Sequence, residues 1–240
     1  MGYFWVILNV IGEYRGKSTM LKQFTNSNWL KQYKLTLNLS QIQKDVLIGT
    51  VLGDGSLKVS RSGKAAQLQI CHSFSSKEYV FWKKQVFNNW VFCEPRYYQI
   101  NNSLIFRTVS HPMIYEYMKA FYTGKVRIVP KNITNILKSN LSLAVWFMDD
   151  GNGYLRNSAY RISTYAFGLE GNMSLKNCLR QNFGLDVSIC RDSKGYQIYV
   201  PISNGSALRF KSLIEPYILP SMRYKIESRS PVETYIGGTR

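Results

Sequence analysis

The chain has few acidic residues and almost no histidine. It carries 14 Asp and Glu against 31 Lys and Arg, and its only histidines are His72 and His111. So few histidines exclude nuclease classes that rely on clustered histidines, and they argue against a Ser-His-Asp hydrolase. The sequence also has no Walker loop, and no G-x-G-x-x-G follows an expected strand. These absences exclude the common nucleotide-binding motifs.

Cysteine pairs and long apolar runs are also missing. No C-x-x-C occurs among the four cysteines, so we expect no zinc site, and their apolar neighbours predict buried thiols in a reducing compartment. The apolar stretch at 3–11 is too short to span a bilayer and lacks the features of a signal peptide. It is either a peripheral strand or a remnant of an upstream reading frame. The cysteines are Cys71, Cys93, Cys178 and Cys190.

What the chain has in abundance is positive charge and aromatic side chains. The formal net charge is +17, with 17 Tyr and 12 Phe in a chain that is 45% hydrophobic. This composition supports a packed core and points to a polyanionic partner, either nucleic acid or an anionic membrane surface. Because the basic residues are dispersed among Tyr, Phe and Thr, they fit strands facing a phosphate backbone better than a membrane anchor.

Two segments share an apolar run that ends in Asp-Gly. Residues 47–55 read LIGTVLGDG and residues 143–151 read LAVWFMDDG, so Asp54 aligns with Asp150. A glycine commonly ends a helix, but an acid in the last turn opposes the helix dipole. Two helices with this feature indicate a cation at their ends, and Asp carboxylates are usual magnesium ligands. The alternative is a simple turn after a core helix. Because the Asp-Gly ending occurs twice in so basic a chain, we favour a metal site over a simple turn.

The pattern along the chain predicts an α+β fold with two pseudo-symmetric αββαββα halves. Ser40 is the expected N-cap of the first acidic helix. A short helix is expected near residues 28–33, in an extension that either touches DNA or is a solvated lead-in. The predicted parts are a basic N-terminal extension (1–39), a first half (40–124), a linker (125–140), a second half (141–229) and a C-terminal tail (230–240).

These segments resemble the signature of LAGLIDADG homing endonucleases, in the single-chain form with two motifs. Residues 126–130 read VRIVP and resemble a segment of the mitochondrial large-rRNA intron endonuclease subfamily in which a basic residue stands shortly before "I-P". Residues 219–225 resemble the "P-x-M-x-Y-K" element of the same subfamily. The resemblance covers about residues 36–229. The signature matches at Leu47, Gly49, Asp54, Gly55, Leu143, Ala144, Asp150 and Gly151, and departs at Ile48 and Val145.

The resemblance implies that the two helices pack together beneath a DNA-binding β-saddle and that their last acids share divalent metal. Asp54 and Asp150 are then the expected metal ligands and catalytic acids. Asp149 and its first-half counterpart Gly53 border the metal site, and Asp149 is expected to be a supporting acid. The cofactor implied is Mg²⁺, with Mn²⁺ able to substitute. Paired metals would activate a water and stabilise the leaving oxygen.

Two basic residues, Lys225 and Arg127, match the family's basic pair beside the metals. Arg127 stands where a lysine is expected, and Lys125 is the nearby alternative. An arginine stays protonated, so it could stabilise charge but not act as a base. The alternative for both is a plain phosphate contact. Further candidates for DNA contacts, each weighed against a solvated strand face, are Lys58, Arg61, Gln67, Gln69, Arg107, Arg161 and Arg191.

The resemblance thus implies a monomeric, site-specific double-strand DNA endonuclease encoded in a mobile intron, leaving short 3′ overhangs. Its partner would be a double-stranded DNA target, and no membrane is expected. The alternative is a maturase that binds host intron RNA, since a basic saddle serves either nucleic acid. A regulator of the same fold would predict eroded acids, and both acids are present. The expected location is an organelle, mitochondrion or chloroplast, in a eukaryote, and the cytoplasm otherwise.

Overall fold

The computed structural model describes residues 28–154 and 159–227 of the chain. These belong to two compact units, Met1–Asn38 and Leu39–Arg240. Within the first unit, helix α2 (Asn28–Thr36) confirms the short helix expected there, and Trp29 stacks on Tyr33 with ring centroids 5.1 Å apart. The apolar stretch at 3–11 and the tail at 230–240 lie outside the described residues.

The second unit is built on two apolar helices, α3 (Gln41–Leu52) and α7 (Asn140–Asp150). Ser40 caps α3 as predicted, because its side chain accepts from the Gln43 backbone while the Gln43 side chain accepts from the Ser40 N–H. From residue 45 to 52 and from 142 to 148, every residue is buried. A helix that is apolar on all sides lies inside a core, and both helices do so.

The two helices approach each other closely at Gly49. A Cβ placed on Gly49 would lie 2.4 Å from the Ser142 carbonyl oxygen and 2.7 Å from the Val145 Cβ. The Ser142 hydroxyl also donates to the Asp45 carbonyl across the interface at 2.9 Å. The valine that departs from the expected signature at 145 is therefore accommodated because glycine stands opposite it on α3.

Each half of the second unit adds a four-stranded antiparallel sheet and two further helices. The strand orders are β1-β2-β4-β3 and β7-β8-β10-β9, the same in both halves. This confirms the predicted αββαββα repeat. The first half contains β1 (Ser56–Val59), β2 (Ala66–Ser73), α4 (Lys77–Val86), β3 (Arg96–Tyr98), β4 (Ser103–Arg107) and α5 (Pro112–Phe121). The second contains β7 (Gly151–Tyr154), β8 (Ala159–Ile162), α8 (Gly168–Phe183), β9 (Ser188–Asp192), β10 (Gly195–Val200) and α9 (Ser206–Ile214).

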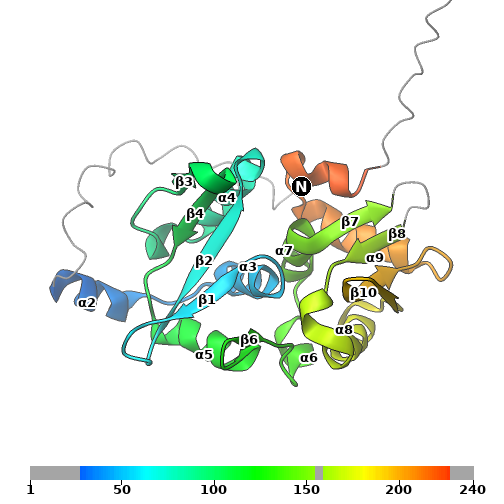
Figure 1. Ribbon diagram of the computed structural model, residues 1–240, viewed down its shortest axis with the longest axis horizontal. Coiled ribbons are helices and arrows are strands. Elements are labelled where there is room, and N and C mark those ends of the chain that lie inside the picture. The colour runs from blue at the N-terminus through cyan, green and yellow to red at the C-terminus, as the bar shows by residue number, and fades with distance from the viewer. Residues whose placement is uncertain (1–27, 155–158, 228–240) are drawn as a thin grey trace, which may run out of the picture. The chain divides into compact units, whose positions relative to one another are not determined.

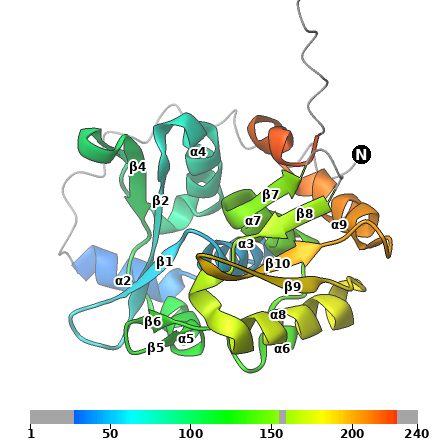
Figure 2. The same cartoon turned by 45° about the vertical axis from the view of Figure 1, so that its right-hand side comes forward.

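Figure 1 shows α3 and α7 side by side between the two sheets, and the turned view in Figure 2 keeps this arrangement. Helices α4 and α5 contact the first sheet, and α8 and α9 contact the second. Strand alternation gives each sheet an apolar face for these helices. In the first sheet that face carries Leu68, Ile70 and Phe106, all buried.

The connector between the halves is more structured than the sequence predicted. It contains a two-stranded sheet, β5 (Tyr122–Thr123) with β6 (Val126–Arg127), and the short helix α6 (Ile133–Ile136). Two short 3-10 helices, η6 (Glu215–Tyr217) and η7 (Pro220–Lys225), follow α9. As a result, both residues of the expected basic pair lie on ordered elements, Arg127 on β6 and Lys225 on η7.

The expectation that all cysteines are buried was wrong for three of them. Cys178 is buried on α8, Cys93 is exposed, and Cys71 and Cys190 are half-buried. Cys71 and Cys190 lie on strands, where successive side chains point to opposite faces of the sheet. Their apolar sequence neighbours therefore lie on the other face and do not indicate that the cysteines are buried. All four are free thiols. Within the described residues, no helix is long and apolar enough to cross a membrane.

Candidate active site

The ends of α3 and α7 bring three acids together. Asp54 follows α3, and its side chain is 48% exposed, whereas the adjacent Asp149 side chain on α7 is fully buried. The Asp54 backbone N–H donates to the Asp149 Oδ2 at 3.3 Å. A Cβ on Gly53 would lie 2.4 Å from the Asp149 Cβ, so only glycine leaves room for this acid. The first-half counterpart of Asp149 therefore lacks a side chain for a packing reason.

Lys83 neutralises the buried Asp149. Its Nζ lies 2.8 Å from Asp149 Oδ1 and 3.1 Å from Oδ2, and neither side chain is exposed. The ammonium also lies 4.2 Å from the centroid of the Tyr79 ring, one turn earlier on α4. Burial lowers the pKa of Lys83, and the Asp149 carboxylate acts in the opposite direction. A buried carboxylate requires such a partner, because an unpaired one would pay the full cost of desolvation.

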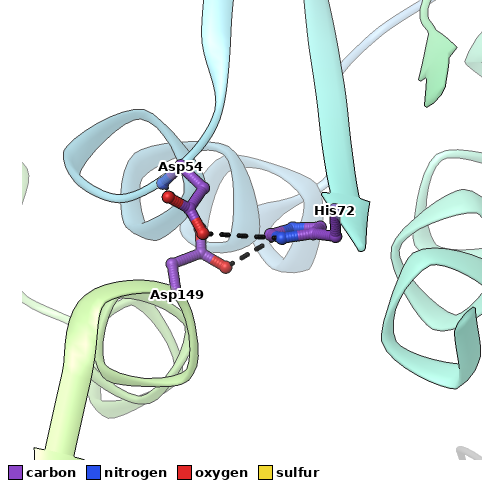
Figure 3. Close-up of side chains that lie close together, drawn as sticks. All are labelled: Asp54, His72 and Asp149. Carbon is purple, nitrogen blue, oxygen red and sulfur yellow. Dashed lines mark hydrogen bonds and ion pairs between the residues drawn. The ribbon is translucent and has the colours of Figure 1, made fainter. Parts of the chain in front are cut away.

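His72 bridges the two acids from strand β2 (Figure 3). Its Nδ1 lies 3.5 Å from Asp54 Oδ2, and its Nε2 lies 3.7 Å from Asp149 Oδ1 and 3.2 Å from Lys83 Nζ. The His72 side chain is only 8% exposed. Sequence reasoning used this histidine only to exclude other nucleases and did not consider Lys83. Their spacing could have indicated both residues. His72 lies two residues after Ile70 on the buried face of β2, and Lys83 lies four residues after the buried Tyr79, on the same side of α4.

The two expected basic residues occupy equivalent places at the two helix ends. Arg127 Nη1 donates to the carbonyl oxygens of Val51 (3.0 Å), Gly55 (3.3 Å) and Gly53. Lys225 Nζ donates to the carbonyl of Met148 at 2.6 Å and to that of Asp149 at 3.3 Å. Cations are favourable at a helix C-terminus, where carbonyls lack intrahelical partners. Arg127 and Lys225 thus supply the positive charge that a helix C-terminus favours, and they offset the unfavourable acids in these last turns. Lys125, the alternative to Arg127, is exposed in the β5–β6 turn.

The surroundings shift the pKa values of Asp54 and Asp150 in opposite directions. Burial, with the charges of Asp54 and Asp149, raises the pKa of the Asp150 carboxyl to about 7, although Arg127 and Lys225 act against the rise. Burial also opposes ionisation of Asp54, but the hydrogen bond and electrostatic interaction with His72, followed by the charges of Lys83 and Lys225, outweigh it and lower the pKa of Asp54. The negative charge at Asp150 is therefore the less compensated of the two.

Asp54 and Asp150 lie close enough that the charge of Asp54 helps to raise the pKa of Asp150. Hard oxygen ligands suit Mg²⁺, and an added positive charge would oppose both the burial and the repulsion that raise the pKa of Asp150. Within the described residues, the group whose ligand atoms lie within 4.8 Å of one another is Asp54 with His72 and Asp149, and Asp150 is not part of it. There the Lys83 ammonium already lies between His72 and Asp149 and takes the place of a metal ion. Gly53, which was predicted to border the metal site, has no side chain and offers only its carbonyl oxygen as a ligand atom. That oxygen accepts a hydrogen bond from Arg127.

Several of the predicted DNA contacts share the uncovered face of the first sheet. Lys58 pairs across from Gln67, and Gln69 from Arg107, whose Nε donates to the Gln69 side chain at 2.8 Å. Arg61 is exposed in the β1–β2 turn. Arg96 pairs across from Ile105 and is exposed on the same face. Arg96 was not predicted from the sequence as a DNA contact, although the alternation of side chains along β3 places it on this face.

In the second sheet the two arginines fall on opposite faces. Arg161 pairs across from Tyr199, with its guanidinium 5.8 Å from the ring centroid, on the face away from the buried Ile198. Arg191 pairs across from Tyr196, on the face that carries Ile198. Because strand side chains alternate, Arg161 and Arg191 do not belong to one surface.

The match to a known family covers most of the second unit. The sequence profile of the LAGLIDADG DNA endonuclease family matches residues 44–208, a span that begins in α3 and includes both acidic helices. The chain belongs to the LAGLIDADG DNA endonuclease family.

Relatives of this LAGLIDADG protein include a probable intron-encoded endonuclease 1 from Wickerhamomyces canadensis, 30% identical over 88% of the chain and 95% of the relative. The cytochrome b mRNA maturase bI2 of Saccharomyces cerevisiae is 24% identical over 85% of the chain and 52% of the maturase. Among solved structures, the homing endonuclease I-WcaI bound to its DNA recognition sequence superposes with a TM-score of 0.79 and 29% identity, covering 89% of this chain and 98% of that one. The family, and the mixed helix and antiparallel-sheet fold, are those expected from the two acidic motifs.

Proposed function

We propose that this LAGLIDADG protein is a site-specific endonuclease that hydrolyses phosphodiester bonds in double-stranded DNA with Mg²⁺, for which Mn²⁺ can substitute. The observation that carries the proposal is the pair of acids, Asp54 and Asp150, at the ends of two packed helices, with Arg127 and Lys225 beside them. The I-WcaI structure, in which a similar chain is bound to its recognition sequence, supports a DNA target.

In this proposal Asp54 and Asp150 hold the divalent metal. When bound, the ion supplies Lewis-acid chemistry, which lowers the pKa of a water and neutralises charge on the leaving oxygen. Lys225 and Arg127 hold the helix ends and place positive charge beside the reacting phosphate. Arg127 remains protonated and acts only through its charge, whereas burial lowers the pKa of Lys225. Asp149, neutralised by Lys83, supports the site rather than binding metal.

Target recognition is proposed for the uncovered sheet faces. Arginine and glutamine match the acceptor and donor patterns of guanine and adenine in the major groove, and lysine suits phosphates. Because Arg191 shares the face of the buried Ile198, we leave it out of this surface. The proposed contacts are Lys58, Arg61, Gln67, Gln69, Arg96, Arg107 and Arg161.

Both acids come from a single chain, so we propose a monomer. By analogy with the intron-encoded relative from Wickerhamomyces canadensis, the chain would be encoded in a mobile intron and, in a eukaryote, act in an organelle. The similarity to a maturase supports a second candidate function, binding of intron RNA. A pure maturase has no use for a metal-binding acid pair, and for this reason cleavage is the function we favour.

The test is cleavage of a DNA library that includes candidate intron insertion sites, in Mg²⁺. We expect breaks at one site with the natural chain and with the control Glu116→Gln, which replaces an exposed acid that pairs with Lys119. Cleavage should be lost in Asp150→Asn. Undiminished cleavage by Asp150→Asn would contradict the assignment of the metal site. If the natural chain cuts no DNA but binds a structured intron RNA tightly, the maturase is the better description.

A further inference from the structure

His72 reaches Asp54 from a position fixed by several neighbours. It stands near the end of β2, with Ala66, Leu68 and Ile70 on the same buried face, and only 8% of its side chain is exposed. The Tyr79 ring packs against the imidazole with centroids 5.1 Å apart. The ring therefore has little freedom to turn, and its two nitrogens face two different groups.

The group on one side determines which nitrogen can carry hydrogen. Lys83 Nζ lies 3.2 Å from His72 Nε2, and an ammonium has three donors and no acceptor. The other group near Nε2, Asp149 Oδ1, is farther away at 3.7 Å and already accepts from Lys83. The nearest partner of Nε2 is therefore a donor, and Nε2 presents its lone pair to it. The hydrogen of a neutral imidazole then resides on Nδ1, which faces Asp54 Oδ2 at 3.5 Å.

Lys83 is itself held in place. It is fully buried and bonded to both oxygens of Asp149, and Asp149 in turn accepts the backbone N–H of Asp54. Asp54 is thus held twice, through its backbone by Asp149 and through its carboxylate by His72. Among the described residues, the Asp150 carboxylate accepts no comparable hydrogen bond, so the two motif acids are supported differently.

We propose that His72 is a positioning residue for Asp54, fixed in its Nδ1–H tautomer by the buried Lys83. This inference rests on the proposed role of Asp54 in holding metal, and it names the residues that orient that ligand. Groups that orient a metal ligand typically change metal affinity or activity by about 10–100-fold when removed.

The test compares two amide replacements. The side-chain nitrogen of asparagine can stand in for Nδ1, while that of glutamine reaches toward the place of Nε2. We expect His72→Asn to keep Mn²⁺ affinity, measured by electron paramagnetic resonance, within about threefold of the natural chain. His72→Gln and His72→Ala should weaken it by about 10–100-fold. Where DNA is cleaved, kcat should fall in the same order with the Kd for DNA in Ca²⁺ unchanged.

A direct measurement on the natural chain covers the case in which buried variants fail to fold. Nitrogen-15 chemical shifts of the His72 ring distinguish the tautomers, and we expect hydrogen on Nδ1. Hydrogen on Nε2, or equal Mn²⁺ affinity in His72→Asn and His72→Gln, would overturn the proposal. Neither the ring shifts nor the Mn²⁺ affinity requires cleavage, so failure of this inference can be told from failure of the proposed function.

Discussion

At the scale of single residues, the site concentrates charge in a partly buried place. Asp54, Asp149 and Asp150 lie together, and only Asp149 is fully neutralised by a buried partner. Burial, together with repulsion from Asp54 and Asp149, raises the pKa of Asp150 to about 7. Perturbed pKa values of this kind are typical of functional sites.

The pKa of Asp150 predicts a pH-dependent stability. An unfolded Asp has a pKa of about 3.9, so the folded state binds more protons between about pH 4 and 7, and the free energy of unfolding should fall as pH rises through that window. In EDTA, Asp150→Asn should be more stable than the natural chain at pH 8 by roughly 2 kcal/mol, with a smaller gain at pH 5. Urea titrations at both pH values would measure this. A pH-independent difference would contradict the prediction, and added Mg²⁺ should narrow the gap at pH 8.

The buried ion pair predicts a strong dependence of stability on Lys83. Lys83→Met should reduce the free energy of unfolding by about 3–5 kcal/mol, because the Asp149 charge is left buried and unpaired. The double variant Lys83→Met with Asp149→Asn should recover most of that loss. As a matched control, Lys119→Met breaks an exposed pair with Glu116 and should cost less than about 1 kcal/mol. Equal losses for both lysines in urea titration would argue against the buried pair.

At the scale of elements, the central contact is the approach of α3 to α7. Glycine at 49 and the hydroxyl of Ser142 permit it, and Arg127 and Lys225 complete the two helix ends. This arrangement places an acid at each C-terminus without leaving the last carbonyls unpaired. The two helices could be predicted from their local sequence. The basic residues that bond their ends, Arg127 and Lys225, come from elements far along the chain.

Replacing Gly49 tests this contact. Alanine improves helix propensity by about 1 kcal/mol, yet its Cβ would lie 2.4 Å from a backbone oxygen of α7 that cannot move independently. We expect Gly49→Ala to destabilise the chain by about 1–3 kcal/mol and to slow cleavage, since the helices must separate. Thermal unfolding and cleavage rates measure both effects. A stabilised variant would mean that the helices yield more easily than the geometry indicates.

At the scale of the whole molecule, the net charge of +17 dominates any encounter with DNA. Its effect on affinity depends on salt, because binding releases counterions from the phosphates. By their chemistry lysine suits phosphates and glutamine suits base edges, and the first sheet carries both residue types on one face. Lys58 and Gln67, paired across β1 and β2, provide a matched comparison.

We expect Lys58→Ala to weaken DNA binding for all sequences and to reduce the slope of log K against log salt by about 1. Gln67→Ala should leave the slope unchanged and relax preference at one base pair, at a cost of about 1–3 kcal/mol. Fluorescence anisotropy at several salt concentrations, with target and scrambled duplexes, measures both. Identical behaviour of the two variants would contradict the division of roles.

The local pattern of the sequence was enough to predict the two acidic helices, the Ser40 cap and the repeated αββαββα order. Each depends on residues within a few positions of one another, where apolar periodicity, capping and turn chemistry act. The pairing of the helices was implied by the resemblance to the family, which rests on both acidic motifs and on the segments 126–130 and 219–225. The structured connector was not predicted, because two-residue strands carry no periodicity to detect.

Tertiary structure alone decided which groups surround the acids. His72 and Lys83 meet Asp149 across more than sixty residues of chain, and in sequence they look like a strand histidine and a surface lysine. Register likewise separated Arg191 from Arg161, since a shift of one residue moves a side chain to the other face of the sheet. The sequence determined where the acids stand on their helices. Long-range packing determined that Asp149 is neutralised by Lys83, that Asp54 faces a histidine and that burial raises the pKa of Asp150 despite Arg127 and Lys225.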